Sequence, residues 1–280
     1  MRIKTTKSAF FANFVPHFKQ KNMQFATVPY YKRRLRSIIF TLFNRLEYNN
    51  NAHFEQNGES LFVKNLLKKH QNSTITVFDI GANKGDYTQM LLDMQPKYGV
   101  NCQISAFEPQ KTAFSWLQKR FGQHANVRLF NYGISDENTQ AQIYFDAPGS
   151  TLASLFHRDF SHFEKHNLAQ TNAETIELKT LEWHIKTENT PKIHFLKIDI
   201  EGNELTAFKG LGAYLNPSFI EIIQFEYGGA NLDAGVFLKQ LFEILEKNGY
   251  AIYKITPKGL EKKKYSPMLE NFQYANYVAM

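Results

Sequence analysis

Residues 75–88 read Ile75-Thr-Val-Phe-Asp79-Ile-Gly81-Ala-Asn83-Lys-Gly85-Asp86-Tyr87-Thr88, an order that predicts a strand, a tight turn and the start of a helix. The β-branched and aromatic residues at its beginning are typical of a short buried strand. Two glycines then break the strand before a helical run that reaches Met94. In an open parallel sheet, ligands bind beyond the carboxyl ends of the strands, where glycines expose backbone N–H groups. The segment therefore predicts a ligand site at this turn.

The turn matches neither of two common phosphate-binding patterns. Asn83 stands where the dinucleotide fingerprint needs its second glycine, and the Walker lysine pattern is absent. Residues 79–85 instead resemble the first motif of the class I S-adenosylmethionine (SAM) methyltransferases, in the variant of the FkbM family. Later segments match this family in the same order: Ala106-Phe-Glu108-Pro109, Leu196-Lys-Ile-Asp199-Ile-Glu201-Gly202-Asn-Glu204, Phe208-Lys-Gly210 and Ile223-Gln-Phe-Glu226.

Helices are predicted over residues 59–69, 86–94 and 111–121. Strands alternate with them and with later helices, which is typical of an α/β, doubly wound and mostly parallel sheet. The resemblance implies a Rossmann-like sheet of seven strands with an antiparallel last strand. Residues 140–192 show the least regular pattern and are interpreted as an acceptor-binding lid or insert. The pair His162 and His166 within it could hold a metal, but solvated histidines are the favoured interpretation.

The positive charge is concentrated at the N-terminus. Residues 1–48 contain ten Lys or Arg and one acid, whereas the remaining 232 residues contain 23 basic and 25 acidic residues. This distribution argues against a groove that binds nucleic acid on the main domain. We therefore expect a basic N-terminal extension over residues 1–58 and a methyltransferase domain over residues 59–280.

An amphipathic helix is predicted at about 32–47 in the extension. Its apolar residues recur at the spacing of one helical stripe, and the other face is basic: Leu35, Ile38, Ile39, Leu42, Phe43 and Leu46. Packing of the stripe on the domain's own core is the favoured interpretation. Contact with a membrane surface, or with a glycosyltransferase partner, is the alternative.

The single cysteine, Cys102, permits no intramolecular disulfide, which fits a reducing compartment. The sequence also shows no apolar run long enough to span a bilayer. We therefore expect a cytoplasmic protein, with peripheral attachment to the inner membrane as a further expectation.

The resemblance implies that SAM binds at the first turn. Glu108, at the end of the second strand, would accept hydrogen bonds from the ribose hydroxyls, as a strand-end carboxylate does in dinucleotide sites. Asp79 would orient the turn, and the amides after Gly81 would hold the methionine carboxylate. Gly133 and Ile134 would border the adenine. The expected cofactor-binding residues are thus Asp79, Gly81, Asn83, Gly85, Glu108, Gly133 and Ile134.

The catalytic candidates lie at the ends of two later strands. Strand alternation points Lys197, Asp199 and Glu201 to one side, and Glu226 ends the following strand. Three carboxylates in one crevice could bind sugar hydroxyls, act as a general base or hold a divalent metal. Asp199 is the first candidate for the base and Glu226 the second, and a structural ion pair with Lys197 is the alternative.

The resemblance implies a SAM-dependent O-methyltransferase that acts on a hydroxyl, with a sugar of a bacterial surface polysaccharide or glycolipid as the expected acceptor. Two alternatives remain open. One is a non-catalytic SAM-fold partner of glycosyltransferases, and the other is an RNA methyltransferase, which the acidic main domain disfavours.

Overall fold

The computed structural model describes residues 27–158 and 170–280. The chain divides into two compact units, residues 1–43 and 44–280. The helix α1 (Tyr30–Leu46) begins in the first unit, and its last three residues belong to the second. His162 and His166 lie outside the described residues.

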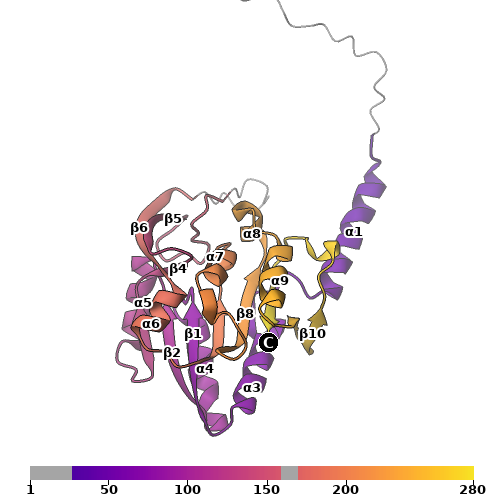
Figure 1. Ribbon diagram of the computed structural model, residues 1–280. Helices are drawn as coiled ribbons and strands as arrows, with labels where there is room; N and C mark the ends of the chain where they lie inside the picture. Colours follow the sequence, from indigo (N-terminus) through magenta and orange to yellow (C-terminus); the bar gives the residue numbers. More distant parts are fainter. Residues whose placement is uncertain (1–26, 159–169) are drawn as a thin grey trace, which may run out of the picture. The chain divides into compact units, whose positions relative to one another are not determined.

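Eight strands of the described residues form one mixed sheet in the second unit (Figure 1). In spatial order they are β10 (Gly259–Lys263), β9 (Ile252–Thr256), β11 (Ala275–Ala279), β8 (Ile220–Tyr227), β7 (Ile193–Ile198), β1 (Thr74–Ile80), β2 (Asn101–Phe107) and β3 (Val127–Phe130). The strands from β8 to β3 are parallel, and β11 lies antiparallel to both β8 and β9. The doubly wound sheet and its antiparallel last strand confirm the prediction.

The predicted number of seven strands is wrong, since β10 adds an eighth at the edge. A turn at Pro257 and Lys258 folds β10 back onto β9. The sequence of β10 is Gly-Leu-Glu-Lys-Lys, and charged residues of this kind are depleted in strands. Its ladder with β9, rather than its own propensity, keeps it extended.

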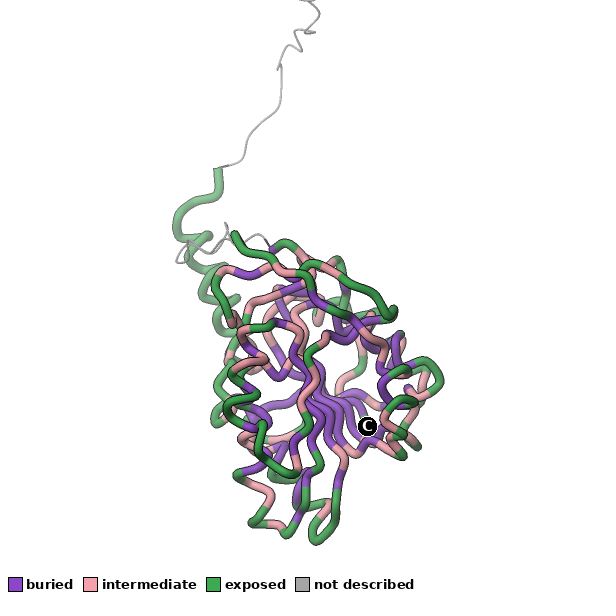
Figure 2. Tube along the Cα trace, turned by 90° about the vertical axis from the view of Figure 1, so that its left-hand side faces the viewer, coloured by how far each residue is buried: buried purple, intermediate pink, exposed green. Residues whose placement is uncertain are grey.

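Helices cover both faces of the main sheet. One apolar core joins the sheet to α3 (Glu59–Lys69), α4 (Asp86–Met94) and α5 (Lys111–Phe121). The other joins it to α6 (Leu181–Thr187), α7 (Glu204–Lys209) and α9 (Leu238–Lys247). Neighbouring residues of β1 alternate between the two cores, because Val77 belongs to the first and Phe78 to the second. Figure 2 shows the buried strands at the centre of this unit and exposed chain around them.

The interval predicted to be irregular forms a second sheet, so that prediction is wrong for much of residues 140–192. Among the described residues its three strands are ordered β4 (Gly133–Ser135), β6 (Asn172–Thr180) and β5 (Thr139–Phe145). Only one face of this sheet is buried, and its small core consists of Ile143, Phe145, Ile176 and Leu178. Polar residues alternate with the apolar ones in β6, and this hides the strand in a search for apolar runs.

The remaining helices are short. They are α2 (Phe54–Asn57), α8 (Gly229–Ala234) and three 3₁₀ turns at Gln95–Tyr98, Gly212–Tyr214 and Pro267–Leu269. Within the described ranges, none of the helices has the length and apolar character needed to cross a bilayer.

The turn that follows α1 is fixed to the C-terminal strands. The Glu47 carboxylate lies 3.4 Å from Lys254 Nζ and 3.2 Å from Lys263 Nζ. Asn50 N donates to Tyr274 O at 2.9 Å, and Tyr274 N donates to Asn50 Oδ1 at 3.1 Å. Residues 47–50 therefore belong to the second unit, whereas the boundary predicted from the sequence lies after residue 58.

Candidate active site

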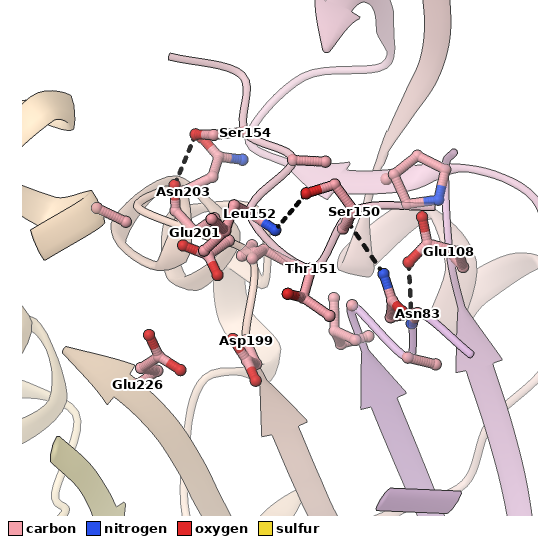
Figure 3. Close-up of a pocket in the computed structure, with 18 of the residues that line it drawn as sticks. Asn83, Glu108, Ser150, Thr151, Leu152, Ser154, Asp199, Glu201, Asn203 and Glu226 are labelled. Atoms are coloured by element: carbon pink, nitrogen blue, oxygen red, sulfur yellow. Dashed lines mark hydrogen bonds between the residues drawn. The ribbon is translucent and has the colours of Figure 1, made fainter. Parts of the chain in front are cut away.

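A cavity of about 670 Å³ opens at the carboxyl ends of β1, β2, β7 and β8. This volume is within the range of small-molecule sites. Besides the strand ends, its lining includes residues from 50–54, from the arm 150–158 between β5 and β6, and from 272–274. Figure 3 shows carboxylates from separate strands facing this space. Nearly all of the predicted site residues line it: Gly81, Asn83, Glu108, Gly133, Ile134, Lys197, Asp199, Glu201 and Glu226.

The glycine turn packs closely against the end of β7. Gly81 has a φ of +80°, and a Cβ at this position would lie 1.9 Å from Asp199 O. Gly85, with a φ of +84°, precedes α4, and a Cβ there would lie 2.3 Å from the Phe121 ring. Both positions therefore require glycine. The close approach at Gly81 brings the turn next to Asp199.

The backbone amides of this turn already donate hydrogen bonds to other groups of the protein. Ala82 N donates to Phe107 O at 2.9 Å, and Asn83 N donates to Glu108 Oε2 at 2.9 Å. The geometry therefore does not support the expectation that these amides hold a ligand carboxylate. The N-terminus of α4 has no side-chain cap, so its first amides are the better placed donors.

Glu108 is a buried carboxylate at the cavity wall. Its Oε1 accepts from Gln110 N at 2.8 Å and its Oε2 accepts from Asn83 N at 2.9 Å. Burial raises the pKa of Glu108 to about 7, although these two hydrogen bonds oppose the shift. Each oxygen retains a second lone pair with which it can accept a ligand hydroxyl.

Lys197 is buried between two carboxylates. Its Nζ lies 3.1 Å from Asp199 Oδ2 and 3.7 Å from Asp79 Oδ1, and it sits over the Tyr87 ring at 5.1 Å. Burial lowers the pKa of Lys197, but the carboxylates of Asp199 and Asp79 raise it more, so the ammonium stays charged. Asp79 does not line the cavity and also accepts from Thr88 Oγ1 at 2.7 Å. Asp79 therefore stabilises the end of β1 without facing the cavity.

Asp199, Glu201 and Glu226 form the acidic end of the cavity. One oxygen from each lies within 4.8 Å of the others, which makes them the metal-compatible group among the described residues. Burial raises the pKa of Glu226 well above its usual value, and the nearby charges of Asp199 and Glu201 raise it further. Like charges this close do not all ionise at neutral pH. We therefore expect Glu226 to hold a proton at neutral pH.

The arm carries a cation, Arg158, that no sequence motif marks. Arg158 is 8% exposed, and its guanidinium lies 2.7 Å from Glu201 Oε2 and 3.3 Å from Asp233 Oδ2. Ser154 Oγ donates to Glu201 O at 2.7 Å, and Asn83 Nδ2 donates to Ser150 O at 3.2 Å. The arm is thus fixed to both sides of the cavity. Its location within residues 140–192 is the one signal that the sequence offered.

An aromatic wall, formed by Phe54, Phe272 and Tyr274, completes the cavity. Phe272 has a φ of +50°, and Glu201, which also lines the cavity, has a φ of +51°. Such backbone conformations are costly for residues other than glycine and gather at functional sites. No sequence motif marked the aromatic wall, because its members come from two distant segments.

Gly81→Ala is expected to abolish ligand binding at the turn and to lower the melting temperature, because the added Cβ meets the Asp199 carbonyl. Gly235→Ala is the matched control. Gly235 also has a positive φ, +66°, but open space surrounds it, so only the backbone cost of about 1–2 kcal/mol applies. Thermal melts and ligand titrations of both variants check this. Equal effects of the two substitutions would contradict the packing described here.

The ligand-free protein is expected to lose thermal stability as the pH rises from about 6.5 to about 8. Burial, and then Asp199, raise the pKa of Glu201 to about 8, while burial raises that of Glu204 to about 7. In this window the folded state binds more protons than the unfolded state, so stability falls as the protons leave. Burial lowers the pKa of His70 and of His184. These histidines therefore change the stability only at pH values below this window. Melts of Glu201→Gln should show a shallower fall, and a stability that rises with pH would contradict the electrostatics.

A sequence model of a known family, described as a methyltransferase FkbM domain, matches residues 79–252. The chain is also 28% identical over 149 residues to methyltransferase 1 of Beauveria bassiana. That match covers 48% of this chain and 57% of the relative, so the chain spans little more than half the length of the relative.

Two solved structures illustrate the range of similar folds. The FkbM methyltransferase of Methylobacillus flagellatus is 16% identical, with 75% of this chain and 44% of that chain covered and a TM-score of 0.47. The 1,6-didemethyltoxoflavin-N1-methyltransferase of Burkholderia thailandensis, solved with S-adenosylhomocysteine (SAH), is 12% identical, with 92% of each chain covered and a TM-score of 0.39.

Proposed function

This chain belongs to the FkbM methyltransferase family, and from this membership we propose that it transfers the methyl group of SAM to a hydroxyl of a sugar in a bacterial surface polysaccharide or glycolipid. The observation that carries the proposal is the pair Asp199 and Glu226, held at the acidic end of the same cavity as the glycine turn. Transfer to an aliphatic hydroxyl needs a group that removes its proton, and this pair supplies one.

The residues around the glycine turn fit SAM. The buried Glu108 carboxylate offers acceptor positions for two ribose hydroxyls, and the uncapped start of α4 offers donors to the amino-acid carboxylate. Gly133 and Ile134 line the same part of the wall and support an adenine contact. When bound, SAM supplies an electrophilic methyl group on a sulfonium.

The opposite end of the cavity suits a sugar. Carboxylates accept hydrogen bonds from neighbouring hydroxyls, and aromatic side chains offer flat surfaces to the apolar face of a ring. Glu201 and Glu226 supply the first feature and the aromatic wall supplies the second. Arg158 holds Glu201 in place from the side of the arm.

The role of Asp199 follows from its surroundings. Lys197 Nζ lies 3.1 Å from its carboxylate, and the protonated Glu226 can donate a hydrogen bond to the same carboxylate. Asp199 therefore accepts the proton as the acceptor oxygen forms its bond to the methyl carbon and the bond from that carbon to sulfur breaks. The walls of the cavity keep the reacting atoms aligned and exclude water.

A divalent ion held by Asp199, Glu201 and Glu226 is the alternative way to activate the hydroxyl, because their oxygens lie close enough to share one ion. Activity that persists in EDTA would support the base. Activity that is lost in EDTA and restored by Mg²⁺ would support the ion.

The test is incubation of the protein with labelled SAM and surface glycan from a strain that lacks this enzyme. Label in a methyl ether of a sugar, identified by NMR, is the expected result. SAH binding without transfer to any glycan would favour the non-catalytic partner of glycosyltransferases, and label in RNA would favour the RNA methyltransferase.

A further inference from the structure

The helix α1 has one apolar stripe that finds little cover among the described residues. The helix buries none of its residues within the described part of the chain. Phe43 is half-buried, whereas the other five residues of the stripe are between 51% and 79% exposed: Leu35, Ile38, Ile39, Leu42 and Leu46. Contiguous apolar surface of this kind is costly in water and marks a place where something else docks.

Basic residues border this stripe on both sides. With about 3.6 residues per turn, Arg34 and Arg45 lie along one edge of the stripe, and Lys32 and Arg36 lie along the other. Residues 1–46 contain no Asp or Glu at all. Long basic side chains at the edges of an apolar stripe can extend their charges to the headgroups while the stripe enters the acyl boundary.

We propose that α1 is a docking helix for the surface of an anionic phospholipid membrane. An apolar stripe with only positive charges around it is complementary to acyl chains beneath acidic headgroups. A protein partner would have to match the same stripe with a shaped groove and acidic residues, whereas the lipid surface needs neither. The charge pattern therefore favours the lipid surface.

Chain continuity links this helix to the acceptor end of the cavity. Asn44, in the last turn of α1, donates from Nδ2 to Gln273 Oε1 at 3.3 Å, and Asn50 donates to the same oxygen at 2.8 Å. Asn50 and Gln273 both line the cavity beside the aromatic wall. The chain therefore passes from α1 to the cavity wall within a few residues, so a membrane that binds α1 would tether the cavity to its surface. This step rests on the proposed function, and it implies an acceptor presented at the membrane surface, such as a glycan on a lipid carrier.

The test is co-sedimentation of the full chain with vesicles of phosphatidylcholine alone, or with an equal part of phosphatidylglycerol. We expect binding to the mixed vesicles that weakens with added salt, and weak binding to the neutral ones. Arg34→Gln with Arg36→Gln removes one charge from each edge and should reduce the affinity by about fivefold for each charge removed. Lys119→Gln with Lys247→Gln removes two exposed charges from the other unit and should change little.

A second pair of variants isolates the apolar stripe. Ile38→Glu with Leu42→Glu places two charges on the stripe, and Ser37→Glu with Thr41→Glu places the same two charges on the polar face of the same helix. The first pair should lose more affinity for mixed vesicles than the second. Equal losses, equal binding to neutral vesicles, or no binding by the wild type would each overturn the proposal.

The failure of this proposal can be told apart from failure of the proposed function. The stripe variants should keep their affinity for SAH, because α1 contributes nothing to the glycine turn. Vesicle binding by a protein that does not bind SAH would support the docking helix and contradict the methyl transfer. SAH binding by a protein that does not bind vesicles would contradict the docking helix and leave the methyl transfer supported.

Discussion

Asp199→Asn is expected to lower kcat by about 100- to 10,000-fold while the affinity for SAH stays nearly unchanged. The asparagine keeps the size and hydrogen-bonding shape of the side chain but cannot take the proton of the acceptor hydroxyl. Lys197 would lose its nearest anionic partner, yet Asp79 at 3.7 Å still balances its charge. Single-turnover methyl transfer and an SAH titration of the same variant measure the two quantities.

Glu226→Gln is the matched comparison. If Glu226 already holds a proton at neutral pH, a glutamine imitates it and most of the turnover remains. Full activity of Asp199→Asn together with an inactive Glu226→Gln would make Glu226, rather than Asp199, the base. Full activity of both variants would contradict a carboxylate base at this site.

Glu108→Ala is expected to weaken SAM binding by about 10- to 100-fold, because a hydrogen bond to a charged group contributes about 1.5–3 kcal/mol. The substitution also leaves the amides of Asn83 and Gln110 without acceptors, which loosens the glycine turn. Equilibrium dialysis with labelled SAM measures the loss.

Two further variants separate these effects. Glu108→Gln retains one acceptor oxygen and should weaken binding less than the alanine. Glu177→Gln removes an exposed carboxylate, 57% accessible, from β6 and should leave binding unchanged. Wild-type affinity in Glu108→Ala would show that the ligand does not contact this carboxylate.

The main sheet could be predicted because its signals are local. The strand at Ile75, the glycine turn and the helix up to Met94 follow one another within twenty residues, so periodicity and glycine positions define them. The helices Glu59–Lys69, Asp86–Met94 and Lys111–Phe121 begin and end where the pattern placed them. The convergence of Glu108, Asp199 and Glu226 also follows from the sequence, since parallel strands end at the same edge.

The remainder of the site depends on contacts between distant segments. Arg158 reaches Glu201 across 43 residues, and Tyr274 reaches Asn50 across 224. Neither contact is marked in the sequence by a periodic pattern or by a motif. The strand β10 and the second sheet were missed for a related reason, since ladder partners, rather than the propensity of the strands themselves, hold them.

The central claim is that the cavity beside the glycine turn binds SAM, and calorimetric titration of the purified protein with SAH tests it most directly. The expected result is one site per chain with a micromolar dissociation constant, weakened in Glu108→Ala and unchanged in Asp199→Asn. No binding by the wild-type protein, with or without Mg²⁺, would contradict the claim.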